Sequence, residues 1–563
     1  MAARNCRQCS SKSIDEISIS WVHGAEAPEN KAHGRFPFVF GYCTADEDCG
    51  GDDPLGGCRF FGNDTWHVSR VYVWASRLHM DAAPDRADLP GRLKVMDEAI
   101  EGIRNRDKIK NYAHFDLRVS FSSVQNEVTN SEFVKRHGFY PLIRREHRKI
   151  KWENGVPITD PRPISYAAHK DRCIYQYYAS WLNIIYNEKV RDSGIDQSAI
   201  AYRTNKPGTS TCDFAERLFS YVRKSGPCWV LTGDFRHFFD TVDHQYLVEQ
   251  VRTLFPGGMI PEDMFRVIRS AMRYSYIDIR DLLDYYGLPF SVSGIKRLNN
   301  KKCVMGPAHF RRFVKSKIHV PWREKGEIGI PQGLPISGVL ANIHLMDFDT
   351  CLAAFAEAHG GIYMRYCDDF AIAILEGTAS PRFLLDSLLG FVAGIPGLAI
   401  HSSKTKMFKY DNRGLCKVNM QTLEPFPAGG AQINYLGFSF DGRSVRLRQQ
   451  TIGRFYRKTY RRVKTTFGRR RQPGKRKVEL LYLQSSSRGK NPHGNAKVRA
   501  KLGYGNKHGN FHTYVERAQG VFPDDPISRD TKRHKRKIRA RSEAVRRKVR
   551  RRKRRTCSGN CEW

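Results

Sequence analysis

Long hydrophobic runs are missing from this sequence of 563 residues, and acidic residues are few. No stretch of 18 or more apolar residues occurs, and the N-terminus does not join a charged start to an apolar segment, so neither a membrane-spanning helix nor a secretory signal is predicted. Asp and Glu number 57 against 95 Lys and Arg, a net charge of +38. We expect a cytoplasmic protein with a polyanionic partner, for which nucleic acid is the first candidate and an anionic membrane surface the second.

Cysteine is too sparse for a disulfide framework, because 14 residues are spread over the whole chain. We therefore expect reduced thiols. Cys6 and Cys9 form a Cys-x2-Cys pair that could hold zinc with Cys43, Cys49 and Cys58, but these three are not tightly spaced and no paired His completes the set. Unrelated structural cysteines are the other interpretation.

Composition divides the chain into four segments. Residues 1–95 are rich in Gly, Asp and Cys and form an extension of unknown role, although a helical pattern begins near their end, at Leu89–Arg104. Residues 96–445 alternate strand-like apolar runs with helical patterns, which predicts an α+β fold. Residues 446–525 are a basic helical region, and residues 526–563 are a still more basic tail.

The tail holds 16 Lys or Arg and one acidic residue, Glu543, between Lys532 and Arg555. A run of like charges cannot bury itself, so it is typical of a disordered segment. A solvated tail and a phosphate-binding arm both fit, and an enzyme acting on nucleic acid favours the arm. Just before the tail, Asn510–Arg517 interleaves aromatic and basic residues, which fits either a base-stacking surface or the core face of a helix.

Two adjacent carboxylates lie within the apolar segment Ile362–Ile374. The segment predicts two strands joined by a tight turn, with Asp368 and Asp369 at the tip and Phe370 beginning a buried face. An Asp-Asp turn by itself is commonly a solvated loop, so this motif needs support from elsewhere in the chain.

A third carboxylate, Asp234, ends an apolar strand that begins at Trp229 and is followed by a helical pattern at Val242–Val251. An Asp at a strand end can cap the next helix, but Asp243 is better placed to do so. Asp234 is therefore available as a ligand, and hard carboxylate oxygens suit Mg²⁺.

Between these carboxylates, Gly329–Asn342 surrounds Gln332 with Pro and Gly and predicts a turn leading into a helix that continues to about Asp349. Glycine lets a backbone approach a ligand closely, and Ser337 is placed to cap the helix. Taken alone, this pattern is that of an ordinary loop-to-helix junction.

The order of these motifs resembles the palm of reverse transcriptases. The palm-like residues are Asp234 to Asp240, then Pro331-Gln332-Gly333, then Tyr366-Cys367-Asp368-Asp369. The resemblance extends to Arg162-Pro-Ile, Lys170-Asp-Arg172, Lys404-Thr-Lys406 and Tyr435-Leu-Gly-Phe438, and it covers about residues 130–445. It implies a right-hand polymerase fold, with fingers and palm in residues 96–445 and a thumb-like region in residues 446–525.

This resemblance implies an RNA-directed DNA polymerase that adds deoxynucleoside triphosphates to a 3′ end, with an RNA template and a DNA product. Asp234, Asp368 and Asp369 would hold two Mg²⁺ ions, which activate the attacking hydroxyl and stabilise the leaving pyrophosphate. Lys404 resembles the lysine that lies beside the pyrophosphate and can donate a proton to it.

Other positions resemble the substrate-binding residues of the family. Phe239 falls where a ring packs under the sugar and would clash with a 2′-hydroxyl, and Gln332 lines the nucleotide pocket. The residues that resemble a triphosphate clamp in the fingers are Arg162, Lys170 and Arg172, although exposed cations are usually only solubilising charges. The residues that resemble the primer grip are Tyr435, Leu436, Gly437 and Phe438.

Within the family, Lys135–Leu142, Arg162–Tyr177 and Ala201–Arg203 are most like bacterial reverse transcriptases of the defence-associated, unknown-group kind, and more distantly like retron and group II intron enzymes. Those relatives lack mobility modules and act against phage with a structured non-coding RNA. No RNase H or integrase pattern is recognised here, and the tail matches a His-Asn-His endonuclease poorly. The resemblance therefore implies a role in antiviral defence.

Other activities stay open. An untemplated or protein-primed DNA polymerase would use the same palm residues. A group II intron-type maturase that mainly binds RNA would be expected to have lost a carboxylate, Gln332 or Lys404, and all are present. An RNA-dependent RNA polymerase is disfavoured by Phe239, because a ribonucleotide site needs room for the 2′-hydroxyl. The sequence is also compatible with an oligomer.

Overall fold

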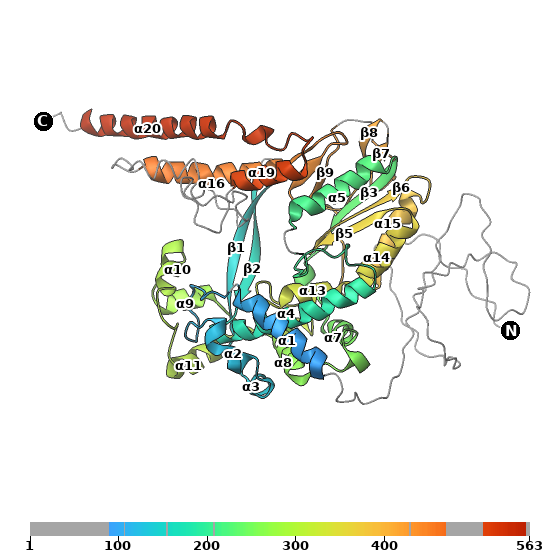
Figure 1. Cartoon of the computed structure of the whole chain (residues 1–563). Helices are drawn as coiled ribbons and strands as arrows, with labels where there is room; N and C mark the ends of the chain where they lie inside the picture. Colours follow the sequence, from blue (N-terminus) through green and yellow to red (C-terminus); the bar gives the residue numbers. More distant parts are fainter. Residues whose placement is uncertain are drawn as a thin grey trace, which may run out of the picture. The chain divides into compact units, whose positions relative to one another are not determined.

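The structure is a computed structural model, and it describes residues 89–105, 107–153, 156–206, 209–411, 413–426, 430–468 and 511–558 (Figure 1). The chain divides into two compact units, Met1–Leu78 and His79–Trp563, and all described residues belong to the second. The predictions for residues 1–88, including zinc at the N-terminal cysteines, lie outside the described residues. Seven cysteines fall within the described ranges, and each is a free thiol.

A five-stranded antiparallel sheet, with strand order β5-β6-β3-β7-β8, is the centre of the second unit. Its strands are β3 Cys228–Asp234, β5 Ile362–Tyr366, β6 Asp369–Leu375, β7 Lys406–Asp411 and β8 Gly414–Val418. Along β6, Phe370, Ile372 and Ile374 enter one hydrophobic core while Ala371 and Ala373 enter another. This alternation confirms the predicted hairpin and leaves its two Asp residues at the tip.

Helices cover both faces of this sheet. The covering helices are α5 Thr211–Lys224 on one face, and α13 Ser337–His344, α14 Met346–Ala358 and α15 Pro381–Ala393 on the other. The predicted α+β class is therefore confirmed. The sheet is anchored between two cores, so its strand ends are held rigidly.

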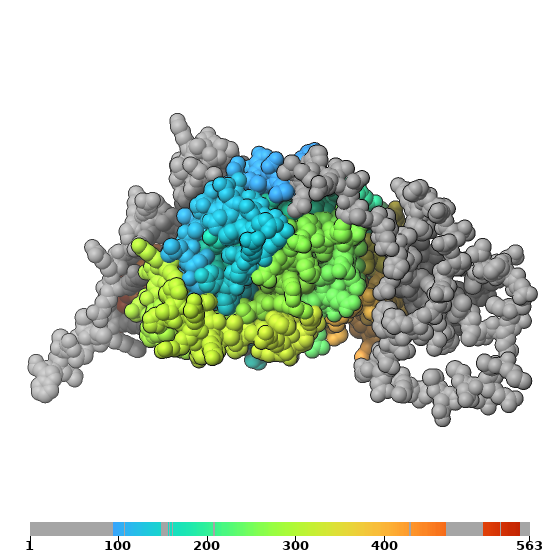
Figure 2. Space-filling view, turned by 90° about the horizontal axis from the view of Figure 1, so that it is seen from below, coloured from blue at the N-terminus to red at the C-terminus, as the bar shows by residue number. Residues whose placement is uncertain are grey.

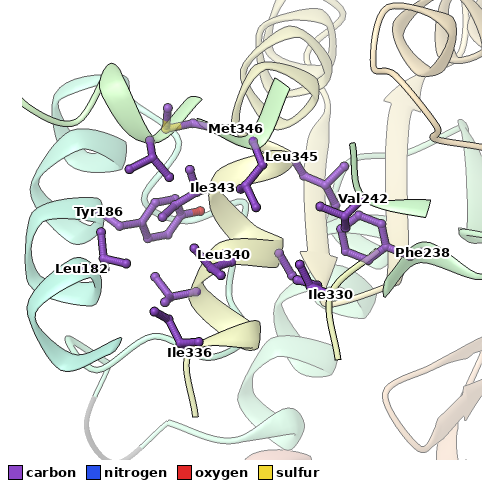
Figure 3. Packing of buried hydrophobic residues seen from close by; sticks show 14 of the residues in the cluster. Leu182, Tyr186, Phe238, Val242, Ile330, Ile336, Leu340, Ile343, Leu345 and Met346 are labelled. Carbon is purple, nitrogen blue, oxygen red and sulfur yellow. The ribbon is translucent and has the colours of Figure 1, made fainter. Parts of the chain in front are cut away.

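Helix α13 lies deep in the larger core. Figure 3 shows Leu340 and Ile343 of α13 between Tyr186 of α4 (His169–Asp192) and Val242 on the opposite side. No single helix in the described ranges is long and apolar enough to cross a membrane; α13 and α14 together pass that test by length and composition, but they are bent by 53°. Their apolar residues are core residues.

The start of α13 differs from the prediction. Ser337 does not cap the helix, because its hydroxyl instead donates to the carbonyl oxygen of Pro331 (2.6 Å). By contrast, Asp243 caps α7 as expected, accepting a hydrogen bond from the Tyr246 backbone N–H (2.8 Å). The Ser337 bond closes the loop onto itself and holds the Pro331–Gly333 turn in place.

A second part of the unit is built around a three-stranded sheet of order β2-β1-β4. A long antiparallel hairpin, β1 Leu142–Glu153 and β2 Val156–Tyr166, pairs with the short parallel strand β4 Tyr276–Asp278. The helices of this part are α1 Leu89–Arg104, α2 Phe121–Val128, α3 Ser131–Arg136, α8 Glu262–Met272, α9 Ile279–Tyr285, α10 Val292–Leu298 and α11 Pro307–Lys317. Figure 2 shows the blue-to-cyan residues of α2 and α3 beside green and yellow-green later segments.

Several short elements connect these parts. They are α6 Phe238–Thr241, α7 His244–Arg252, the 3-10 helix η2 Pro256–Gly258 and α12 Pro321–Lys325. The helix predicted at Val242–Val251 is therefore α7, shifted by one or two residues at its ends.

The C-terminal part begins with a small antiparallel sheet of order β11-β10-β9. Its strands are β9 Ile433–Tyr435, β10 Phe438–Phe440 and β11 Val445–Leu447, followed by α16 Gln449–Phe467, α19 Phe511–Val521, the 3-10 helix η3 Arg529–Thr531 and α20 His534–Ser558. The boundary predicted at 445 and 446 cuts β11, and the one at 95 and 96 cuts α1.

The basic tail also differs from the prediction, because it is helical where disorder is predicted. A periodic stripe of covered residues, including His534, Ile538 and Val545, packs on α16. Lys and Arg are good helix formers, so the charge run does not oppose a helix once one face has a partner. In α19, Phe511 stacks on Phe455 at 4.1 Å between ring centroids, which supports the core-face interpretation of Asn510–Arg517.

Candidate active site

Strand pairing brings the three predicted carboxylates to one edge of the central sheet. Asp234 is the last residue of β3 and is the register partner of Asp369, the first residue of β6. The backbone N–H of Phe235 donates to the Asp368 carbonyl oxygen (3.1 Å), which fixes the turn against β3. The three carboxylates therefore belong to two neighbouring chain segments whose ends are hydrogen-bonded together.

The tip of the hairpin is a strained turn. Cys367 has a positive φ of 62°, in the left-handed region that non-glycine residues rarely adopt. The turn is therefore held by its surroundings, and such strain is commonly retained where side chains must be aimed at a ligand.

The electrostatics of the three carboxylates indicate a missing positive charge. Loss of hydration, followed by the negative charges of Asp368 and Asp234, raises the pKa of Asp369 to about 6. One oxygen of Asp234, Oδ1, is buried without a hydrogen-bond partner. The other, Oδ2, accepts a hydrogen bond from Lys404 Nζ (2.5 Å).

This donor set fits Mg²⁺, which takes oxygen ligands from one or two carboxylates and completes its shell with water and substrate phosphate. The orphaned Asp234 oxygen and the crowded Asp369 carboxyl are the groups a cation would neutralise. Within the described ranges, no three His, Cys, Asp or Glu side chains already converge as a finished metal site. Lys404 is the cation that neighbours Asp234 in this arrangement, so metal binding would require it to move.

The Gln332 loop is threaded between β2 and the segment that follows β3. Ser165 N–H of β2 donates to the Gln332 carbonyl oxygen (2.8 Å), and Ile330 N–H donates to the Phe239 carbonyl oxygen (2.8 Å). Gly333 has a φ of 115°, and a Cβ there would lie 2.3 Å from the Ser165 carbonyl oxygen. Glycine is thus required for close approach to the protein's own backbone, whereas the sequence suggested approach to a ligand.

Phe239 and Gln332 line the same cavity, of about 950 Å³, together with Ile164, Tyr202 and Gly338. Phe239 is partly buried and packs against the main core. The two residues predicted to contact the sugar and the nucleotide therefore face one hollow. The carboxylates are not among its lining residues.

Comparison with known proteins identifies the family. Residues 150–440, more than half of the chain, match the family described as reverse transcriptase (RNA-dependent DNA polymerase). The chain belongs to the reverse transcriptase family. No curated protein matches the chain significantly.

Among solved structures, this reverse transcriptase is similar to telomerases of two yeasts. Truncated apo telomerase from Candida tropicalis has 12% identity and a TM-score of 0.33 over 59% of this chain and 61% of that chain. Full apo telomerase from Candida tropicalis gives 12%, 0.31, 72% and 66%, and Candida albicans telomerase in complex with a TWJ fragment of telomeric RNA gives 11%, 0.31, 72% and 59%. The chain spans about three fifths to two thirds of their lengths, and these scores are too low to support an argument about function.

The predicted triphosphate clamp is only partly available in this reverse transcriptase. Arg162 is exposed on β2. Lys170 is half-buried and its ammonium group donates to Glu127 (2.5 Å), so it would have to exchange partners to bind a phosphate. Arg172 is 6% exposed, and its guanidinium donates to Gln176 (2.8 Å).

The placement of Arg172 corrects the expectation that it contacts the triphosphate. Its guanidinium lies in the interior and also contacts the thiol of Cys173 (3.2 Å). A buried cation whose donors already bind the protein is not available to an incoming polyanion. In this structure, Arg172 holds α4 against its neighbours.

The predicted primer-grip residues form a two-residue hairpin between β9 and β10. Tyr435 pairs with Phe438, and Leu436 and Gly437 both have positive φ, of 47° and 95°, as the mirror-image hairpin turn requires. Tyr435 is buried, its hydroxyl reaches the Met364 carbonyl oxygen of β5 (3.5 Å), and burial together with the negative charge of Asp369 raises its pKa. The hairpin therefore lies beside the carboxylate edge of the central sheet.

Two residues near the carboxylates were not predicted, Tyr202 and Arg448. The hydroxyl of Tyr202 donates to the thiol of Cys367 (3.4 Å), and Tyr202 has a positive φ of 59°. Arg448 is close enough for its positive charge to oppose the rise in the pKa of Asp369. Both come from chain segments remote in sequence, and only the resemblance at Ala201–Arg203 offered any signal.

Proposed function

We propose that this reverse transcriptase is an RNA-directed DNA polymerase that adds deoxynucleotides to a 3′ end. The observation that carries the proposal is the meeting of Asp234, Asp368 and Asp369 at one strand edge, with Lys404 bonded to Asp234. No ordinary structural need gathers three carboxylates at neighbouring strand ends, because their mutual repulsion is unfavourable without a cation.

In the proposed reaction, the 3′-hydroxyl oxygen of the primer forms a bond to the α-phosphorus of the incoming nucleotide. The bond from that phosphorus to the bridging oxygen breaks, pyrophosphate leaves, and the hydroxyl proton passes to solvent. Two bound Mg²⁺ ions, held by Asp234, Asp368 and Asp369, would supply the positive charge that lowers the cost of this transfer.

The chain's own residues account for positioning in this proposal. Lys404, displaced from Asp234 when the site is loaded, is available to neutralise the pyrophosphate and donate a proton to it. Phe239 and Gln332 line the cavity in which the sugar and base would lie, and the ring of Phe239 would occupy the space that a 2′-hydroxyl needs. Deoxynucleotides are therefore the proposed substrates.

The test is incorporation of labelled deoxynucleotides by the purified full chain with Mg²⁺ and a primed RNA template. Asp368→Asn should reduce incorporation at least a hundredfold, because it removes a negative charge from the site without changing its shape. A matched control is Asp284→Asn, an exposed Asp on α9, which should behave as wild type. Equal incorporation by wild type and Asp368→Asn would refute the proposed site.

We further propose that the cytoplasmic template is a structured non-coding RNA and that the enzyme serves antiviral defence in bacteria. The support is the resemblance at Lys135–Leu142 and Arg162–Tyr177 together with the net charge of +38. Sequencing of copurified nucleic acid, with DNA compared to RNA, tests the template: DNA that needs Asp368 and copies no RNA would instead establish untemplated or protein-primed synthesis. Tight RNA binding with no DNA from any variant would favour a maturase-like role.

Protection of cells against phage tests the biological role. Cells expressing wild type should survive infection better than cells expressing Asp368→Asn at equal protein level. Equal plaque counts across a panel of phages would contradict the defence role while leaving the polymerase activity intact.

A further inference from the structure

The two most basic helices of the described chain lie side by side. Figure 1 shows α20 running along α16, and the contacts advance in step along both helices. Lys537 lies over the ring of Tyr456 at 4.6 Å, and Arg546 lies over the ring of Phe467 at 4.4 Å. Since later residues of one helix meet later residues of the other, the helices are parallel.

An apolar seam holds this helix pair together and turns its charges outward. Ile538 of α20 packs with Val463 and Phe467 of α16. All ten Lys and Arg in residues 534–551 are exposed, and Glu543 is the sole acidic residue there. Helix α16 contributes six more Lys and Arg and no Asp or Glu.

Such an arrangement is electrostatically costly without a counter-charge. The charges of two packed helices lie within about one Debye length, roughly 8 Å at physiological ionic strength, so they repel one another. A polyanion that replaces condensed counterions with these side chains gains free energy from counterion release. The surface therefore fits a nucleic acid.

The pattern of aromatic residues decides which form of nucleic acid it fits. Proteins that bind single strands present exposed rings on which bases stack. In α16, α19 and α20 no large hydrophobic side chain is exposed among the described residues, and the rings of Phe455, Tyr456 and Phe467 are buried in the helix interface. What remains is a cationic face about 27 Å long over residues 534–551, at 1.5 Å per residue, which approaches the length of one duplex turn.

We propose that the outer face of α20, supported by α16, binds the phosphate backbone of a nucleic-acid duplex independently of the polymerase centre. Arg536, Arg547 and Arg551 lie on the face of α20 opposite the seam, by the 3.6-residue helical period. Their side chains are exposed, so charge reversal there leaves the interface with α16 untouched.

The test uses the full chain carrying Asp368→Asn, so that binding is measured without synthesis and its outcome does not depend on the proposed polymerase activity. The probes are a blunt 30-base-pair duplex RNA and a single strand of the same length, measured by fluorescence anisotropy from 50 to 400 mM salt. Arg536→Glu, Arg547→Glu and Arg551→Glu together should weaken duplex binding at least tenfold. They should also flatten the dependence of log affinity on log salt concentration by roughly 3 × 0.9.

A control triple variant places the same reversals elsewhere, at Lys224, Arg252 and Arg382, which are exposed on α5, α7 and α15. The helix-pair proposal is overturned if both triple variants weaken duplex binding equally, or if the α20 variant weakens single-strand binding and spares the duplex. Circular dichroism of each variant shows whether α20 remains helical.

A second inference concerns the buried charge behind the catalytic turn. Arg365 of β5 and Asp349 of α14 are both fully buried and make two hydrogen bonds with each other, of 2.7 and 2.5 Å. Arg365 also donates to the carbonyl oxygen of Cys367 (2.9 Å), the residue immediately before Asp368. Tyr363 completes the group by donating to Asp349 (2.7 Å).

Stability alone is a weak reason to keep such a pair. Replacing a buried ion pair with apolar residues of similar volume is often neutral or stabilising, because the desolvation of the charges is no longer required. The bond to Cys367 gives this pair a different consequence, since it holds the left-handed residue that aims the two adjacent carboxylates.

We infer that Arg365 is a positioning residue for Asp368, acting through the Cys367 carbonyl oxygen and oriented by Asp349. The inference rests on the proposed polymerase function. The test variant combines Asp349→Leu, Tyr363→Phe and Arg365→Met, which removes the polar group while keeping its volume. Its urea midpoint should stay close to that of wild type, whereas kcat should fall at least tenfold at unchanged nucleotide KM. The Mg²⁺ concentration for half-maximal rate should rise.

A matched control removes a buried polar pair away from the turn, Tyr178→Phe with Asp263→Leu, whose hydroxyl-to-carboxylate bond is 2.8 Å. This variant should leave the Mg²⁺ dependence unchanged. If the Arg365 variant keeps wild-type kcat and Mg²⁺ dependence, or if the control shifts both to the same extent, Arg365 has only a structural role. If wild type makes no DNA, the polymerase function itself fails.

Discussion

At the scale of single residues, the site depends on charges that the rest of the protein cannot neutralise. The crowding that raises the pKa of Asp369 to about 6, and the orphaned oxygen of Asp234, come from placing carboxylates on adjacent strand ends. The cation that neighbours Asp234 is Lys404. A lysine that alternates between a carboxylate and a departing pyrophosphate would link substrate departure to restoration of the unloaded site.

Phe239 should control the choice of sugar. Phe239→Ala removes the ring from the cavity wall, so incorporation of ribonucleotides relative to deoxynucleotides should rise at least tenfold, measured as the ratio of kcat/KM values. Phe238→Ala is an unsuitable control because Phe238 is a core residue. Leu389→Ala, at an exposed position on α15, is the better one. Unchanged discrimination would show that the steric argument is wrong.

Arg172 should matter for stability more than for nucleotide binding. Arg172→Ala leaves the buried partner Gln176 without its donor and removes packing inside the fingers, so the free energy of unfolding should fall by about 1–3 kcal/mol. The apparent KM for nucleotide should change less than twofold. A large rise in KM at wild-type stability, measured by urea unfolding, would restore the triphosphate-clamp role.

At the scale of elements, the loop that carries Gln332 is defined by how closely it approaches β2. A glycine at position 333 combines a left-handed φ with contact to the Ser165 carbonyl oxygen, and neither tolerates a side chain. The loop also receives the Ser337 hydroxyl at the Pro331 carbonyl oxygen. The predicted pocket residue is thus positioned by backbone contacts that reach across from the fingers hairpin.

Gly333→Ala should therefore push the loop away from β2. We expect at least a tenfold loss in kcat/KM for nucleotide and a lower thermal midpoint, measured by incorporation assays and calorimetry. Gly390→Ala is the control: a Cβ at this helical glycine would point into open space, so Ala there should raise stability by up to about 1 kcal/mol. Normal activity of Gly333→Ala would mean that the loop adapts without cost.

At the scale of the whole molecule, buried neutral histidines make folding sensitive to acid. Burial lowers the pKa of both His114 and His344 to about 3, while an unfolded chain titrates near 6.5. The unfolded state therefore binds more protons below pH 6.5, and stability falls as the pH is lowered from there. Each group contributes a slope of about 1.4 kcal/mol per pH unit over this window.

The free energy of unfolding should accordingly decrease by about 2.7 kcal/mol or more between pH 6 and pH 5, measured by urea titration. His344→Phe should halve the part due to these two groups, because the ring contacts with Phe238 and Tyr246 are kept and the titrating nitrogen is removed. A His344→Phe variant with the same pH dependence as wild type would show that His344 does not remain neutral in the folded state.

The sequence by itself determined the chemistry and the local elements of this protein. Period-two alternation after Asp369 placed the hairpin, the apolar run before Asp234 placed β3, and the order of the motifs identified the reverse transcriptase family. These are local features, and local periodicity is recorded directly in the order of residues.

Tertiary structure alone decided which side chains are available and what holds the turn. Arg172 reads as a phosphate ligand until packing buries it, and the charges of α20 read as disorder until α16 supplies a partner face. The network of Arg365, Asp349 and Cys367 joins residues from separate elements, and no pattern along the chain announces it. Burial and pairing are properties of the folded chain, because they depend on neighbours that only folding brings together.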